Sequence, residues 1–221
     1  MSMFLIYDAE NYEYILQPAG YLLLAVILIA LLASIRIFSK KDSSRQMSTR
    51  QLVFCSMSIA LATAASFIKL ASLPFGGSIT LFSMLFVSLI GYFYGAKTGL
   101  LTGLAHGILQ LIINPYIYAP LQVLLDYPLA FGALGLSGFF HNKKNGLIIG
   151  YITGAAGRYI CHVISGYVFF AEYAPEGMNP MVYTLGYNLT YILPEVIATV
   201  IILCIPAVYK AIGQVKQQAC A

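Results

Sequence analysis

Long apolar segments separated by short polar breaks constrain this chain more than any other feature of its sequence. Between residues 50 and 209 these segments follow one another with few interruptions. About 20 consecutive apolar residues are enough to cross a lipid bilayer as an α-helix. Only 9% of the residues are charged, against roughly a quarter in an ordinary soluble domain, so the chain cannot cover itself with a soluble surface. The sequence therefore predicts an integral membrane protein made of helices.

Proline, glycine and polar residues divide the apolar sequence into seven predicted transmembrane helices. These helices cover residues 18–38, 50–70, 79–95, 98–114, 119–140, 146–170 and 181–209. The last six form a dense block, and a polar, basic run from Lys40 to Arg50 separates the first helix from it. We therefore expect an all-α polytopic membrane helix bundle. Residues 1–46 would supply an arm, an accessory transmembrane helix and a basic linker, and residues 47–221 a six-helix core.

The positions of the basic residues predict how the chain lies in its membrane. Lys and Arg are retained on the cytoplasmic side of short loops. If the N-terminus is outside, ten of the twelve basic residues fall on the cytoplasmic side, and Lys69 runs against the pattern. Glu172 and Glu176 then lie outside, and the C-terminus is cytoplasmic. The net charge of +4 is thus explained by topology, and we expect no nucleic-acid partner.

The sequence shows no pattern typical of an enzyme. Residues 91–98 read GYFYGAKT, which differs from a phosphate loop because Ala96 separates the glycine from the lysine. The four cysteines have no metal-ligand spacing. We expect no catalytic residue, metal or cofactor, so the energy for uphill transport would come from a partner or an ion gradient.

Ionisable residues inside the apolar segments are candidates for a functional site, because a charge within the bilayer is costly. These residues are Asp126, Arg158, Glu195, His106 and His162. Asp126 lies about seven residues, or roughly 10 Å, below the outer end of its helix. His162 and Asn188 reach the same level from two other helices. We expect a binding cavity that opens outward, and the alternative is a set of interhelical hydrogen bonds.

Two of the ionisable residues fit a structural role better. Arg158 lies one turn deeper than His162 on the same helix face, and we expect it to pair with Glu195 or with a backbone carbonyl. His106 stands close to Gly103 and Gly107, and we expect its ring to be packed in the core.

Aromatic residues gather at the same level of the bundle. Tyr183, Tyr187 and Tyr191 recur every four residues along the last helix, and this stripe extends too far inward for an interfacial belt. For Tyr116, Tyr118 and Tyr173 such a belt is a sufficient explanation. Aromatic walls around a carboxylate suit a flat, cationic ligand, which they can hold by stacking and cation–π attraction.

Two stretches carry a resemblance to a known family. Leu121–Phe139 read LQVLLDYPLAFGALGLSGF, and Arg158–Pro194 read RYICHVISGYVFFAEYAPEGMNPMVYTLGYNLTYILP. From about Arg50 to Tyr209 the chain resembles the thiamine-specific S components of energy-coupling factor (ECF) transporters. The resemblance implies a six-helix domain in the bacterial cytoplasmic membrane that binds thiamine from outside. It also implies docking on an ECF module of one membrane scaffold subunit and two ATPase subunits.

The resemblance assigns roles to single residues. It implies that Asp126 is the carboxylate that contacts the ligand, at a position where some members carry Glu. His162, Asn188 and Tyr183 fall on positions that line the vitamin pocket.

The resemblance also places aromatic residues around the ligand. Tyr116 and Tyr127 fall on flanking positions. Phe170 occupies a position where a tryptophan stacks on the ligand in some members. This chain has no tryptophan, so stacking must come from Phe and Tyr. The accessory helix at 18–38 departs from the six helices expected of the family.

A stripe of small residues is the candidate docking surface. Ser56, Ala60 and Ala64 recur every four residues and would let another helix approach closely. In the family that the chain resembles, a similar stripe faces the energising module. Packing inside the bundle is the alternative.

Three other functions stay open at this point. A stand-alone proton-coupled transporter would use Asp126, Glu195 and His162 as a proton relay. An S component for a different vitamin would keep the fold and change the ligand. An intramembrane enzyme has the least support, because no catalytic pair is evident. Thiamine itself fits well, since its thiazolium is cationic and its aminopyrimidine offers a paired donor and acceptor.

Overall fold

The computed structural model describes residues 5–8, 13–19, 22, 47–73 and 77–221 of the chain. The predicted accessory helix at 18–38 and the linker that follows it lie almost wholly outside the described residues. Of the arm that precedes them, strand β1 (Leu5–Asp8) pairs antiparallel with strand β2 (Glu13–Leu16).

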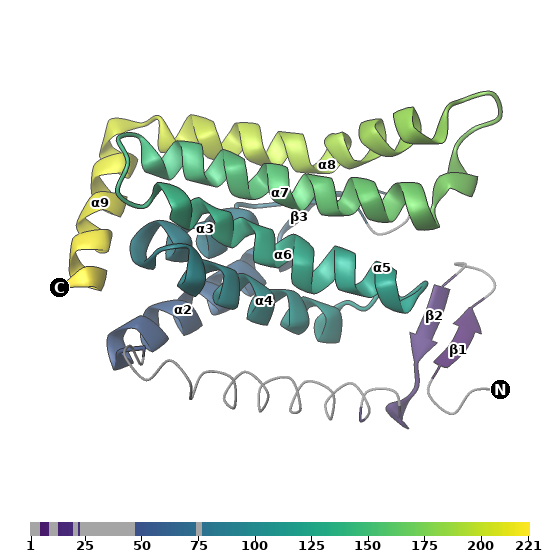
Figure 1. The fold of residues 1–221 in the computed structure, drawn as a ribbon, viewed down its shortest axis with the longest axis horizontal. Helices are drawn as coiled ribbons and strands as arrows, with labels where there is room; N and C mark the ends of the chain where they lie inside the picture. The colour runs from purple at the N-terminus through teal and green to yellow at the C-terminus, as the bar shows by residue number, and fades with distance from the viewer. Residues whose placement is uncertain (1–4, 9–12, 20–21, 23–46, 74–76) are drawn as a thin grey trace.

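The core is a bundle of six apolar segments that run along its long axis (Figure 1). They are α2 (Thr49–Phe67), α3 (Ser83–Tyr94), α4 (Ala96–Ile113), a composite helix (Pro120–Phe140), α7 (Gly146–Phe169) and α8 (Pro180–Leu203). Five of these six are long and apolar enough to cross a membrane, and α3 is shorter. Their leucine, isoleucine and valine side chains cover much of the outer surface, as a lipid-facing bundle requires. The predicted all-α membrane bundle is confirmed.

The helix predicted at 50–70 ends early, the helix predicted at 79–95 begins late, and a short hairpin joins them. Strand β3 (Lys69–Ser72) pairs antiparallel with strand β4 (Ser78–Thr80), so neither helix reaches the boundary expected at residue 70 or 79. Phe82, which precedes α3, adopts a left-handed conformation with φ of 60° that no helix continues through. Apolar β-branched residues such as Ile79 gave the segment a helix-like hydropathy, although they also favour strands.

The composite helix changes its geometry along its length. It begins with α5 (Pro120–Leu124), continues as a π-helical turn, η2 (Leu125–Leu129), then α6 (Ala130–Ala133), and ends as a 3₁₀-helix, η3 (Leu134–Phe140). The π turn contains Pro128, which has no N–H to donate to the preceding turn. Single π turns within helices are often found at functional sites, and this one carries Asp126.

Glycines let the composite helix approach α4 closely. A Cβ atom on Gly103 would lie 2.3 Å from the carbonyl oxygen of Phe131, and one on Gly107 would lie 2.5 Å from that of Tyr127. No side chain fits at either position. This contact fixes the height of the π turn, and therefore of Asp126, against α4.

The predicted last helix, 181–209, is wrong at its C-terminal end. Helix α8 stops at Leu203, and a separate helix, α9 (Pro206–Cys220), follows. Pro206 is the cause, because the residue before a proline is pushed out of the helical region, and Ile205 is extended with ψ of 119°. Helix α9 runs across the end of the bundle at which the C-terminus lies (Figure 1).

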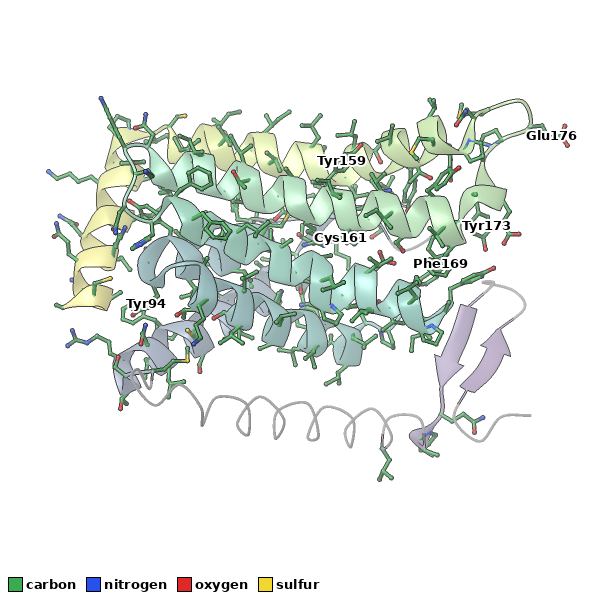
Figure 2. The ribbon with its side chains drawn as sticks, viewed as in Figure 1. Tyr94, Tyr159, Cys161, Phe169, Tyr173 and Glu176 are labelled. Atoms are coloured by element: carbon green, nitrogen blue, oxygen red, sulfur yellow. The ribbon has the colours of Figure 1, made fainter. Side chains whose placement is uncertain are left out.

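Polar contacts fasten α9 to the core helices. The Lys216 amine lies 3.8 Å from the centre of the Tyr92 ring and donates a hydrogen bond to the His141 carbonyl. The Tyr94 hydroxyl, labelled in Figure 2, donates to the Ala219 carbonyl at 3.0 Å. The sequence reading missed this helix, since its polar composition was taken as a tail.

Candidate ligand-binding cavity

A cavity lies at the end of the bundle opposite α9. It is bounded by α4, the π turn, α7, α8 and the β3–β4 hairpin. The volume of the cavity is about 180 Å³. All seven residues predicted to contact a ligand line it: Tyr116, Asp126, Tyr127, His162, Phe170, Tyr183 and Asn188.

Asp126 is held by donors from two helices. Its Oδ2 accepts hydrogen bonds from Gln122 Nε2 at 2.7 Å and from Ser165 Oγ at 2.9 Å. Its Oδ1 lies 3.0 Å from Nδ1 of His162. Three donors occupy three of about four acceptor positions on a carboxylate, and the Asp126 side chain is still 16% exposed to the cavity. The carboxylate is therefore both fixed in place and accessible.

The hydrogen bonds of His162 define which ring nitrogen carries its proton. Arg158 Nε donates to His162 Nε2 at 3.3 Å, and an arginine can only donate. The ring proton therefore sits on Nδ1, where it faces Asp126. In this arrangement the imidazole is neutral, and it lies between the negatively charged Asp126 carboxylate and the positively charged Arg158 guanidinium.

The predicted pairing of Arg158 with Glu195 or a carbonyl is wrong. Within the part of the chain that the structure describes, Arg158 makes no ion pair with Glu195. Its guanidinium carbon lies 4.1 Å above the centre of the Phe131 ring, an arrangement that cation–π attraction stabilises. Both Arg158 and Phe131 line the cavity.

Glu195 is engaged elsewhere. It is 5% exposed and accepts hydrogen bonds from Thr80 Oγ1 at 2.6 Å, Ser83 Oγ at 3.2 Å and the Met84 N–H at 3.0 Å. These three donors belong to β4 and to the start of α3. Glu195 therefore anchors the hairpin and the N-terminus of α3 to α8, where a carboxylate is favoured by the helix dipole.

His106 is packed in the core, as predicted. It is fully buried, its ring meets Phe131 edge to face at 4.9 Å between centroids, and its Nδ1 lies 3.4 Å from Thr63 Oγ1. It does not line the cavity.

An aromatic cluster stands where α5 begins and α7 ends. Phe170 is its centre, with ring centroids 5.9 Å from Tyr116, 5.3 Å from Tyr118 and 5.9 Å from Tyr173. Figure 2 shows Phe169 and Tyr173 at this end of α7, facing the start of α5. Tyr116 and Tyr173 line the cavity, so an interfacial belt is not a sufficient explanation for these two residues.

The tyrosine stripe of α8 forms the opposite wall. Tyr183 stacks on Tyr187 at 6.1 Å, and Tyr187 meets Tyr191 at 5.8 Å. All three line the cavity. The predicted four-residue spacing thus produces one continuous aromatic surface.

The amide of Asn188 is fixed between α7 and α8. Its Nδ2 donates to the Thr184 carbonyl at 2.9 Å and lies 3.4 Å from the His162 carbonyl, and its Oδ1 accepts from the Tyr191 hydroxyl at 2.5 Å. One lone pair of Oδ1 remains for a donor in the cavity.

Sequence reasoning missed several lining residues. Gln122 and Ser165 both bind Asp126, and Lys69, Gly77 and Thr80 enter the lining from the hairpin. Gln122 could have been found, because it precedes Asp126 by four residues and shares its helix face. The hairpin residues gave no such signal, because Lys69 and Thr80 were placed at the ends of predicted helices and Gly77 in the break between them.

The predicted docking residues lie on the outer face of α2. Ser56, Ala60 and Ala64 are all exposed, while Cys55, Ser58 and Ala62 are buried. Packing inside the bundle is therefore not the role of this stripe among the described residues.

Comparison with known proteins gives one consistent result. The thiamine transporter protein family (Thia_YuaJ) matches residues 52–213. Thiamine transporter ThiT of Bacillus subtilis (strain 168) is 40% identical over 167 residues, which is 66% of this chain and 86% of that protein. ThiT of Lacticaseibacillus paracasei is 33% identical over 117 residues, covering 45% and 58% of the two chains. A solved structure of ThiT from Listeria monocytogenes superposes with a TM-score of 0.57 at 26% identity, covering 72% and 96%.

Proposed function

The chain belongs to the thiamine transporter protein family, and we propose that it binds thiamine as the S component of an ECF importer. It is a multi-pass membrane protein of a transporter family rather than an enzyme. In our proposal it takes up thiamine from outside with high affinity, and separate ATPase subunits supply the energy for delivery across the bacterial cytoplasmic membrane.

The observation that carries this proposal is the accessible Asp126 carboxylate between aromatic walls. Thiamine has a permanently cationic thiazolium and a flat aminopyrimidine. A carboxylate supplies the opposite charge, and rings such as Phe170 and Tyr183 supply stacking and cation–π attraction. The free lone pair on Asn188 Oδ1 suits the amino group of the pyrimidine. His162 orients the carboxylate, and Tyr116 and Tyr127 complete the cavity wall.

The direct test is binding of thiamine to the purified protein, measured by isothermal titration calorimetry. We expect one site per chain and no binding of a flexible cation without aromatic character, such as spermidine. A purified, monodisperse protein that failed to bind thiamine, or that bound another vitamin more tightly, would refute the assignment.

The second part of the proposal concerns the partner. The exposed stripe of Ser56, Ala60 and Ala64 on α2 is the surface where an ECF scaffold subunit would dock, since small residues let helices approach closely. Co-purification of a membrane scaffold and two ATPase subunits from the native host tests this part independently of thiamine binding.

A proton-coupled transporter that works alone is the competing function. Its relay would need Asp126, His162 and Glu195 in contact. Glu195 makes no hydrogen bond to either of the other two among the described residues, and its oxygens face the hairpin. Uptake by the isolated chain that an uncoupler abolishes would favour this alternative.

The orientation is also proposed. Arg50, Lys97, Lys144 and Lys210 all lie at the α9 end of the bundle or in the loops beside it, and the positive-inside rule places this end in the cytoplasm. The cavity then opens to the outside.

A further inference from the structure

Gln122 joins the Asp126 carboxylate to the backbone at the mouth of the cavity. It is only 1% exposed. Its Nε2 donates to Asp126 Oδ2 at 2.7 Å and to the Tyr116 carbonyl at 3.2 Å, and its Oε1 accepts from the Tyr118 N–H at 3.0 Å. One buried amide thus makes three hydrogen bonds to three different residues.

These contacts leave the amide of Gln122 a single orientation. Both hydrogens of Nε2 have an acceptor, and Oε1 has a donor. Rotating the amide by 180° would place its oxygen against the carboxylate and its hydrogens against the Tyr118 N–H. The oxygen Oδ2 of Asp126 is therefore held in one place by a group that cannot turn.

The same backbone segment is fixed by a residue on the other side of Asp126. The Tyr127 hydroxyl accepts from the Tyr116 N–H at 2.7 Å and donates to the Asn114 carbonyl at 2.8 Å. The segment from Asn114 to Tyr118 carries two of the rings that surround Phe170. The carboxylate and this aromatic wall are thus parts of one hydrogen-bonded unit.

We propose that Gln122 is a positioning residue for ligand binding, which holds the Asp126 carboxylate at a fixed distance from the Tyr116–Tyr118 wall. A cation that stacks on the wall then meets the carboxylate without any rearrangement, so less conformational freedom is lost on binding. This inference rests on the proposed function, in which Asp126 is the counter-charge of thiamine.

The first measurement is the thiamine affinity of Gln122→Met, which keeps the length of the side chain and removes its hydrogen bonds. We expect affinity to fall about tenfold, since a hydrogen bond to a charged group is worth about that factor. Thr199→Val is the matched control, because it removes two buried hydrogen bonds on α8 outside the cavity. The control should bind within about twofold of wild type.

A double-mutant cycle separates positioning from general loss of stability. If Gln122 acts through Asp126, the loss caused by Gln122→Met should shrink to less than about threefold in an Asp126→Asn background. A purely structural role predicts the same tenfold loss in both backgrounds. Should the methionine variant not be monodisperse, Gln122→Asn replaces it in the cycle, because its amide is one methylene too short to reach all three partners.

A neutral analogue of thiamine gives a second readout. In this analogue a carbon atom replaces the positively charged ring nitrogen. Gln122→Met should weaken the binding of thiamine more than the binding of the analogue, whereas a packing defect would weaken the binding of both ligands equally. Additive losses in the cycle, or equal losses for the two ligands, would overturn the positioning role. The proposed function would still stand in that case, provided that the wild-type protein binds thiamine. Failure of the wild type to bind thiamine would instead remove the proposed function itself.

Discussion

His162 Nδ1 lies 3.0 Å from Asp126 Oδ1, in a contact that joins α7 to the π turn of the composite helix. The two residues are 36 positions apart in the sequence. Because Arg158 donates to the far nitrogen of the ring, the imidazole presents an N–H to the carboxylate and carries no charge of its own. The negative charge of the pair therefore stays on the Asp126 carboxylate, which is 16% exposed to the cavity, while the positive charge of Arg158 lies on the far side of the ring.

The first prediction is that Asp126→Asn weakens thiamine binding by at least about thirtyfold. The substitution keeps the size of the side chain and deletes its charge. Loss of one partner of a buried, hydrogen-bonded charge pair costs about 2–5 kcal/mol, and the lower limit corresponds to about thirtyfold. Calorimetric titration of purified protein measures the change.

Glu195→Gln is the matched control for the loss of a carboxylate. Its oxygens bind Thr80, Ser83 and the Met84 N–H rather than the cavity. We expect a lower melting temperature and a loss of affinity below about tenfold. Wild-type affinity in Asp126→Asn, or a larger loss in Glu195→Gln, would show that the carboxylate of the site has been misassigned.

The second prediction concerns orientation in the membrane. Glu176, labelled in Figure 2, lies in the loop between α7 and α8. Lys144 lies just before α7, at the other end of that helix. In a variant whose four native cysteines are replaced by alanine, a membrane-impermeant thiol reagent should label Glu176→Cys in intact cells and leave Lys144→Cys unlabelled. Both positions should react after the cells are opened. The reverse pattern would place the cavity on the cytoplasmic side and contradict uptake from outside.

The third prediction tests the docking stripe. Ala60→Trp places a large ring in the middle of the exposed face of α2 and does not touch the cavity. We expect unchanged thiamine affinity, with loss of uptake and of co-purification with the ATPase subunits. Ala198→Trp is the matched control, because Ala198 is an exposed small residue on α8. If uptake survived in Ala60→Trp, the scaffold subunit would have to dock elsewhere.

The parts of the fold that follow from hydropathy could be predicted from the sequence. A transmembrane helix must satisfy its own backbone hydrogen bonds in lipid, so long apolar runs such as those of α4 and α7 have no other stable conformation. The depth of the site residues in the membrane could also be predicted, because a helical rise of 1.5 Å per residue places Asp126 and His162 at one level. The convergence of these residues on one cavity follows from that simple geometry.

Features that depend on contacts between distant segments could not be predicted. The hairpin of β3 and β4 is held to α8 by Glu195, whose partners no local pattern identifies. The position of Arg158 over Phe131 needs the close approach of α7 to the composite helix. The break at Pro206 could have been predicted, because proline disfavours a helical conformation in the residue before it. We missed it because the apolar run continues across the proline.

The last prediction uses the absence of tryptophan from this chain. Phe170→Trp would introduce a single indole into the aromatic cluster, where Phe170 lies 5.3 Å from Tyr118 and lines the cavity. We expect thiamine to bind and to quench the indole fluorescence, because a cationic ring would stack on it. Phe139→Trp is the matched control, since Phe139 is 64% exposed at the other end of the composite helix, and its fluorescence should not respond.

Phe170→Ala should lose about tenfold in affinity, the value of one aromatic contact with a cation. Quenching in the Phe139 variant alone, or unchanged affinity in Phe170→Ala, would place the ligand away from this cluster.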